Sequence, residues 1–241
     1  MSRLRVPCSD LREGRLTLAA DEGRYVARVH RLDRGADVLL FDAARGVECD
    51  AVVMEVRPRV VVAAGPPRPA PVLGLPLTLV LGVAKGEKVD DVLRAATALG
   101  AARVLVAATA RSVPRVASPG ARERRWETIA VQAARQSGRG DVPIVAGPAP
   151  LAAALAEVPE SAEWRVALAP TARQSLAAAL VRLRAGEGAA VFVGPEGGLE
   201  PGELALAAAH RFTPVSLGPL VLRAELAAVA ALAATACALR G

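Results

Sequence analysis

Two glycine-containing segments near the end of the 241-residue chain have the residue types and spacing of a ligand site. The first, GPEGGLEPGE at 194–203, ends an apolar strand and begins a helix, and Gly197 and Gly198 permit close approach of the backbone to a ligand. The second, LGPLVLRAE at 217–225, leads from another strand into the last helix. The glycines alone fit a plain tight turn equally well, but Arg223 and Glu225 beside the second turn favour a site.

The glycine pattern differs from the common phosphate-binding loops. No Gly-Lys-Ser/Thr follows the first segment, so it is not a Walker A loop. The Gly-Glu-Gly at 186–188 precedes a strand instead of following one, so it is not a dinucleotide fingerprint. Because Glu196 at the turn would repel a pyrophosphate, a ligand with a cationic or neutral face fits better.

The elements around these segments alternate between strand and helix from residue 77 onward. Six strands are predicted, at 77–84, 102–108, 143–147, 164–170, 189–195 and 212–218, with helices at 88–100, 122–138, 150–158, 175–186 and 201–210 and a last helix after 223. This alternation predicts an α/β fold with a mostly parallel sheet covered on both faces. Ligands of open α/β sheets bind beyond the carboxyl ends of the strands, so we expect the two glycine segments to meet there.

The first 64 residues are β-rich and predict a small barrel. Short strands are expected at 15–19, 37–43, 47–56 and 59–64, with one helix at 21–32. The proline-rich stretch at 65–76 disfavours both helix and central strand and separates two domains, which we place at residues 1–70 and 71–241.

Charge and composition point to an anionic partner. The formal net charge is +6 and the sequence pI is about 10.2. Residues 111–139 hold seven arginines against two glutamates, a net of +5, which predicts a phosphate-facing patch; a solvated helix face is the alternative. Aromatic residues make up only 2% of the chain, which disfavours a row of base-stacking side chains.

The remaining composition gives no sign of metal or membrane. Cys8, Cys49 and Cys237 are scattered and lack CxxC spacing, and neither His30 nor His210 has a partner at metal-ligand spacing, so we expect no metal site and a reducing cytoplasm. The first ten residues lack the apolar core of a signal peptide. The apolar run at 224–239 is short for a bilayer and predicts a buried or subunit-interface helix.

GPEGGL…E followed by LG-x-x-x-LR-x-E resembles the signature of the RsmE-type ribosomal RNA methyltransferases of the SPOUT superfamily. Weaker matches follow the order of that family: RVHRLDRG at 28–35, GVAKGEKVD around Lys85, ATALG at 96–100, RSVPR at 111–115 and QSGRGDVP at 136–143. The resemblance covers nearly the whole chain. It implies a C-terminal α/β trefoil knot and a PUA-like N-terminal β-barrel that binds RNA.

The resemblance also implies a reaction and a cofactor. The family methylates N3 of a uridine in small-subunit (16S) ribosomal RNA with S-adenosylmethionine and is typically dimeric, so we expect a homodimer. The backbones and apolar walls expected to bind S-adenosylmethionine belong to Leu168, Gly194, Pro195, Glu196, Gly197, Gly198, Leu217, Gly218 and Leu222. A carboxylate at Glu196 near the sulfonium is electrostatically favourable, although a helix-capping role for Glu196 fits as well.

Catalytic and RNA-binding roles follow from the same resemblance. Arg223 is the candidate to stabilise the uracil oxygens or a nearby phosphate, and Glu225 either orients Arg223 or acts as a base. A simple ion pair between these two residues is the structural alternative. The candidates for RNA contact are Arg3, Arg5, Arg31, Lys85, Arg111 and Arg139.

Four positions depart from the family pattern and keep two rival functions open. Relatives usually have Glu at Ala98, an acidic residue at Arg135, Ser or Thr at Glu200 and Thr at Leu226. Leu226 lacks the hydroxyl of that Thr and follows Glu225, next to the proposed active centre. The alternatives are an RNA-binding protein with a degenerate methyltransferase domain, or a methyltransferase of a different RNA; a small-molecule enzyme is disfavoured by the arginines of 111–139.

Overall fold

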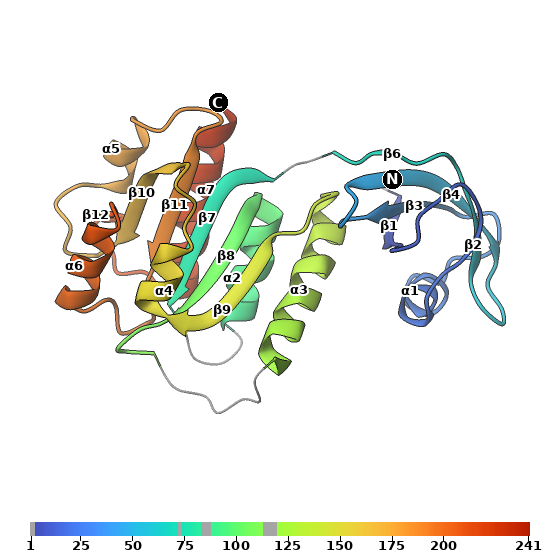
Figure 1. The fold of residues 1–241 in the computed structure, drawn as a ribbon, viewed down its shortest axis with the longest axis horizontal. Coiled ribbons are helices and arrows are strands. Elements are labelled where there is room, and N and C mark those ends of the chain that lie inside the picture. Colours follow the sequence, from blue (N-terminus) through green and yellow to red (C-terminus); the bar gives the residue numbers. More distant parts are fainter. Residues whose placement is uncertain (1–2, 72–73, 83–87, 113–119) are drawn as a thin grey trace. The chain divides into compact units, whose positions relative to one another are not determined.

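The computed structural model describes residues 3–71, 74–82, 88–112 and 120–241, and the chain forms two compact units (Figure 1). The first unit comprises Met1–Leu73 together with Ala134–Val142. The second comprises Gly74–Ala133 and Pro143–Gly241. The short segment Ala134–Val142 therefore belongs with the beginning of the chain, although the residues on both sides of it belong to the second unit.

The first unit is built on one sheet with the order β1-β3-β4-β5-β2. The strands are β1 (Leu4–Pro7), β2 (Gly14–Thr17), β3 (Asp37–Asp42), β4 (Val47–Glu55) and β5 (Val61–Ala64), with the two-residue β6 (Arg68–Pro69) paired to β4. β1 runs parallel to β3 and the other pairings are antiparallel. No pairing joins the end strands β1 and β2 in the part of the chain described, so the predicted closed barrel is not found.

One helical segment packs with this sheet. The predicted helix at 21–32 is shorter and divided: α1 (Ala20–Arg24) continues directly into the π-helical turn η1 (Tyr25–Val29). Inward-facing residues of the strands and helix form one apolar core, which includes Val6, Leu16, Val26, Leu40 and Val62. The alternation of buried and exposed residues along β4 shows the period of two that places one face of the strand in this core.

The second unit contains six parallel strands, as the alternating pattern predicted. The strand order is β12-β10-β11-β7-β8-β9. The strands are β7 (Leu75–Gly82), β8 (Ala101–Ala108), β9 (Ile144–Pro150), β10 (Ala162–Leu168), β11 (Gly188–Val193) and β12 (Thr213–Val215). Residues 189–193 of the central β11 are all buried, because helices cover both faces of a parallel sheet.

The helices pack in two groups on this sheet (Figure 1). The elements are α2 (Lys88–Leu99), α3 (Ala121–Ser137), α4 (Leu151–Ala156), α5 (Leu176–Leu180), α6 (Pro201–Ala209) and α7 (Ala224–Arg240). α7 packs on β7 and β11 and contacts α2 and α5. α4 packs on β8 and β9 and contacts α6, which lies on β12. Within the described ranges, no helix has the length and hydropathy that a bilayer-spanning segment needs.

Candidate functional site

The carboxyl ends of neighbouring parallel strands bring the two glycine segments to one edge of the second sheet. β10 lies between β11 and β12, so Leu168 at the end of β10 separates the segment after β11 from the segment after β12. Leu168 is in register with Val215, and the Ala169 N–H donates to the Val215 carbonyl at 2.9 Å. This is the edge at which an open α/β sheet binds ligands.

The first glycine segment forms a tight turn whose shape excludes larger residues. Gly198 has a φ of +72°, and its N–H donates to the Pro195 carbonyl at 2.8 Å. A Cβ atom on Gly194 would lie 2.8 Å from the Leu199 side chain, so glycine is required there as well. Gly194 and Pro195 are buried, whereas Glu196 and Gly197 are exposed and present their backbone to the edge.

The loop after β8 holds this turn from the side. Glu203 accepts hydrogen bonds from the Glu200 N–H and the Ala110 N–H, each at 2.8 Å, and so ties the start of α6 to this loop. Arg111 donates to the Gly197 carbonyl, and its Nε lies 3.6 Å from Glu200 Oε1. The predicted RNA contact Arg111 is therefore part of the wall of the glycine turn.

The second glycine segment ends at the N-terminus of α7. Gly218 has a φ of +120°, and Leu217, Gly218 and Leu222 are half-buried. Arg223 is the N-cap residue of α7 and is exposed, with no side-chain capping hydrogen bond. Its guanidinium thus belongs to the surface of the same edge.

Lys88, the first residue of α2, connects the two segments. Its Nζ lies 2.8 Å from Glu196 Oε1 and 3.4 Å from Glu225 Oε2. The hydrogen bond to Glu196 raises the pKa of Lys88 above its ordinary value, with Glu225 adding to the effect. We refer to Lys88, Glu196 and Glu225 as the lysine bridge.

Sequence reasoning missed the lysine bridge. It selected Lys85, which lies outside the described residues, although Lys88 stands in the same GVAKGEKVD stretch. The position of Lys88 after β7, which pairs with β11, was the available signal. Glu225 was expected to orient Arg223, but the ion pair that the structure gives Glu225 is with Lys88. Glu225 Oε2 is also buried, and its partner among the described residues is the Lys88 ammonium at 3.4 Å, which leaves a further lone pair to accept from a ligand.

Two of the predicted RNA contacts lie inside the first unit. Arg139 is 2% exposed and pairs with Asp141 at 2.5 Å. Arg5 lies 3.1 Å from Glu48, stacks on Phe41, and donates to the Arg139 carbonyl at 3.3 Å. These placements do not support direct RNA contact by Arg5 or Arg139, because their guanidinium groups satisfy buried carboxylates and carbonyls.

The other candidates differ in their surroundings. Arg3 is exposed but pairs with Asp50 at 2.5 Å, whereas Arg31 is exposed with a φ of +51°. Within the predicted patch of 111–139, Arg125 pairs with Asp90, and Arg135 lies 3.8 Å from Glu22. Much of the positive charge that the sequence concentrates in this stretch is therefore neutralised by nearby carboxylates. Arg115 lies outside the described residues.

The chain matches a family model described as an RNA methyltransferase domain over residues 71–236. It is 31% identical over 233 residues to the ribosomal RNA small subunit methyltransferase E of Synechocystis, covering 96% of this chain and 76% of that protein. The corresponding protein of Mycobacterium tuberculosis is 33% identical, with 89% and 83% covered.

Solved structures agree with this match. A Legionella pneumophila protein solved with its cofactor S-adenosylmethionine superposes with a TM-score of 0.87 at 26% identity, over 99% of this chain and 98% of that one. The Neisseria gonorrhoeae ribosomal RNA small subunit methyltransferase E, bound to S-adenosylmethionine, gives 0.81 at 27% identity over 97% and 96%. By sequence and by fold, the chain belongs to the ribosomal RNA small subunit methyltransferase E family.

Proposed function

We propose that this protein transfers a methyl group from S-adenosylmethionine to N3 of a uridine in small-subunit ribosomal RNA. The observation that carries the proposal is the meeting of the two glycine segments at one sheet edge, joined by Lys88. The family membership and the cofactor bound by two similar structures support it. The site and the relatives therefore support the same class of reaction.

The residues at the edge fit S-adenosylmethionine. Half-buried Leu168, Leu217 and Leu222 offer apolar surface for the adenosine, and the exposed backbone at Glu196 and Gly197 offers donors and acceptors. Beyond its ion pair with Lys88, Glu225 Oε2 supplies a further acceptor. The two carboxylates and one ammonium of the lysine bridge leave a net negative charge, which suits a sulfonium. When bound, S-adenosylmethionine supplies an electrophilic methyl group.

The side chains of the site act by positioning and by charge. A uracil whose N3 proton has passed to solvent water carries negative charge on its oxygens, and the exposed guanidinium of Arg223 at the same edge can stabilise that charge. Glu225 lies 3.4 Å from the Lys88 ammonium, which favours a positioning role for Glu225 over proton removal. In this scheme Lys88 holds both segments in the arrangement that receives the methyl donor.

We further propose the domain and assembly assignments that the family suggests. Residues 1–70 act as a PUA-like RNA-binding domain, and residues 71–241 form a knotted SPOUT methyltransferase domain. The exposed apolar side chains Leu220 (77%), Val221 (83%) and Leu226 (54%) support a homodimer interface beside the second segment, since they form apolar surface next to the site. A cytoplasmic location fits the ribosomal substrate.

The test is methyl transfer to small ribosomal subunits from cells that lack this protein. Incubation with tritiated S-adenosylmethionine, followed by nucleoside mass spectrometry, is expected to yield one methylated uridine carrying the methyl at N3. Calorimetry with S-adenosylmethionine separates the alternatives. Cofactor binding without transfer to any RNA would favour the degenerate RNA-binding protein, and transfer to a different RNA would change the substrate assignment.

A further inference from the structure

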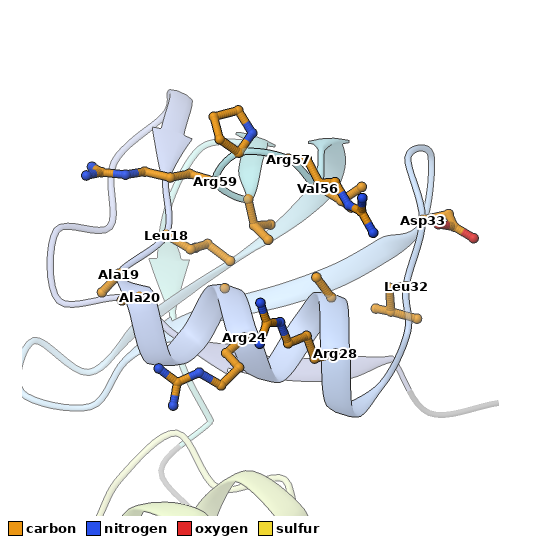
Figure 2. Close-up of a pocket in the computed structure, with 14 residues that line it drawn as sticks. Leu18, Ala19, Ala20, Arg24, Arg28, Leu32, Asp33, Val56, Arg57 and Arg59 are labelled. Atoms are coloured by element: carbon orange, nitrogen blue, oxygen red, sulfur yellow. The ribbon is translucent and has the colours of Figure 1, made fainter.

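The first unit contains a cleft of about 1240 Å³ between the α1–η1 helical segment and the turn from β4 to β5 (Figure 2). Arg24 and Arg28 project from the helical segment, and Arg57 and Arg59 from the turn. Apolar side chains lie between these walls: Leu18, Ala27, Leu32, Val56 and Val60. The cleft therefore has an apolar floor with guanidinium groups along both sides.

The arginines of this cleft differ from most other arginines of the unit in their partners. Arg28, Arg57 and Arg59 are exposed, and within the described residues they have no ion pair or hydrogen bond from their side chains. Arg24 lies 3.5 Å from Asp21, and the Asp21 side chain is 86% exposed to solvent. Elsewhere in the unit, Arg31 and Arg34 are also exposed and without a carboxylate partner among the described residues. Most of the other arginines pair with carboxylates: Arg3, Arg5, Arg12, Arg15, Arg45, Arg68, Arg135 and Arg139.

The charge of the cleft follows from this difference. Four arginines and one aspartate, Asp33, line it, which gives a net charge of +3. Unpaired cations gathered on one concave surface create a field that attracts a polyanion. Asp33 is the one carboxylate in the lining, and no ion pair joins it to Arg28, Arg57 or Arg59 among the described residues, so most of this field is not cancelled within the cleft.

The backbone holds the two walls in place. Gly23 is buried against Val60, and a Cβ atom at Gly23 would stand 3.5 Å from the Val60 side chain, so the helix approaches the strand closely. The Leu18 N–H also donates to the Val60 carbonyl at 2.9 Å. Arg57 and Arg59 flank Pro58 on the short turn between β4 and β5. The four guanidinium groups therefore extend from anchored backbone.

We propose that this cleft binds the sugar–phosphate backbone of the RNA substrate, at a site separate from the one that binds S-adenosylmethionine. The proposal rests on the proposed function, because it assumes that the substrate is RNA. Guanidinium groups pair with phosphates through two parallel hydrogen bonds. The volume exceeds the roughly 300–1,000 Å³ of ordinary small-molecule pockets, which fits a segment of polymer better than a small anion.

The lining residues also indicate that the cleft does not recognise the base sequence of the RNA. It contains no aromatic side chain on which a base could stack. Phosphate contacts position a protein on its nucleic acid without reading the sequence. The cleft is therefore expected to contribute affinity and register, while choice of the uridine stays with the methyl-transfer site.

The test compares the triple variant Arg28→Ala/Arg57→Ala/Arg59→Ala with Arg12→Ala/Arg15→Ala. The control arginines are exposed, lie in the same unit, pair with Asp10 and Glu55, and do not line the cleft. Binding to unmethylated small subunits is measured over a salt series, and methyl transfer is measured at rising subunit concentration. The triple variant is expected to bind about tenfold or more weakly, with a salt slope smaller by about 2, from about 0.7 for each lost phosphate contact.

The kinetic readout separates this role from catalysis. KM for the subunit rises in the triple variant, whereas kcat at saturating subunit and the Kd for S-adenosylmethionine stay at wild-type values. An Arg28→Lys/Arg57→Lys/Arg59→Lys variant keeps the charge and is expected to restore the salt slope. Wild-type affinity and slope in the triple variant would overturn the proposal.

Two further outcomes remain distinguishable. If the triple variant has lost its folded circular dichroism spectrum, the double variant Arg57→Gln/Arg59→Gln on the exposed turn carries the test instead, with the same expected direction of change in affinity and salt slope. If wild-type protein binds subunits but transfers no methyl group, the proposed function fails, while the salt series still decides whether the cleft binds RNA.

Discussion

The two functional regions of the molecule handle charge in opposite ways. At the edge of the second sheet, Lys88 lies between Glu196 and Glu225, so one ammonium group pairs with two carboxylates. In the cleft of the first unit, Arg28, Arg57 and Arg59 have no such partners within the described residues. A region whose charges are internally paired suits a small ligand that is itself both cationic and anionic. A region of unpaired cations suits a polyanion, whose affinity depends on salt.

The largest expected effect is at Arg223. Replacement by alanine removes the exposed guanidinium at the N-cap of α7 and is expected to lower kcat for methyl transfer by about 10²–10³-fold, as loss of one oxyanion-stabilising donor does. The Kd for S-adenosylmethionine and the salt slope of subunit binding should remain unchanged. Single-turnover assays check this. An unchanged kcat would remove Arg223 from the reaction and leave the edge with a cofactor-binding role only.

A smaller effect is expected from filling the glycine turn. Gly194→Val places a side chain within about 3 Å of Leu199 and should lower S-adenosylmethionine affinity, with a loss of about 1–3 kcal/mol in unfolding free energy from overpacking. Gly202→Ala is the matched control, because a Cβ atom at Gly202 meets nothing within 4 Å. Calorimetry and denaturant titration of both variants check the prediction; equal cofactor affinity in the two would show that the turn does not shape the cofactor site.

The lysine bridge predicts a further, moderate effect. Lys88→Met leaves two carboxylates without their shared cation and is expected to raise KM for S-adenosylmethionine about fivefold to tenfold. The salt slope of subunit binding should not move, because the cleft is untouched. A change in salt slope without a change in cofactor KM would contradict the division between the two regions.

The bridge also has a defined pH dependence. The hydrogen bond to Glu196 raises the pKa of Lys88 above its ordinary 10.5. The ion pair between Lys88 and Glu196 is therefore fully formed below the ordinary pKa, and it is lost as the pH rises through the higher pKa of the folded protein. Lys88 should therefore give no pH dependence of cofactor binding between about pH 7 and 9. The wild-type minus Lys88→Met difference in binding, measured across this range, should be flat.

The smallest predicted effect concerns thiol reactivity, which compares two cysteines of the first unit with an exposed cysteine of the second unit. Burial raises the pKa of the Cys8 and Cys49 thiols in the first unit. Cys237 on α7 is exposed. A maleimide at neutral pH should label Cys237 first. A labelling rate that depends on the concentration of this protein would indicate that α7 lies in a dimer interface. Rapid labelling of Cys49 would contradict the packing of the first unit.

Periodicity was sufficient to predict the parallel sheet of the second unit and the sheet edge at which the two glycine segments meet, because the information is local. Alternating apolar strands and helices specify a parallel sheet, and parallel strands place their carboxyl ends at one edge. The partners of charged residues are not local. Arg139 pairs with Asp141 close by, but the carbonyl of Arg139 accepts from Arg5, which lies 134 residues away, and Lys88 meets Glu196 and Glu225.

The same limit explains the errors in the first unit. β1 is four residues long, pairs parallel with β3, and leaves the sheet open, none of which the short stretch LRVP could indicate. The same limit applies to the charge surplus at 111–139, which spans parts of both units, because composition does not reveal which arginines have carboxylate partners. Arg28 and the pair Arg57 and Arg59 lie about 30 residues apart in the sequence, so their gathering around one cleft needed the fold.

The assignment of Ala134–Val142 to the first unit has a consequence for biosynthesis. A nascent chain cannot complete this unit at residue 73, because Arg135 and Arg139 have not yet been synthesised. Arg135 contacts Tyr25 and Glu22, and the Arg139 carbonyl accepts a hydrogen bond from Arg5. At about 5–20 residues per second, the early segment waits several seconds for them. A fragment ending at residue 73 should accordingly be less stable than the same residues in the whole protein, and exchange of this unit between relatives requires both pieces to be moved together.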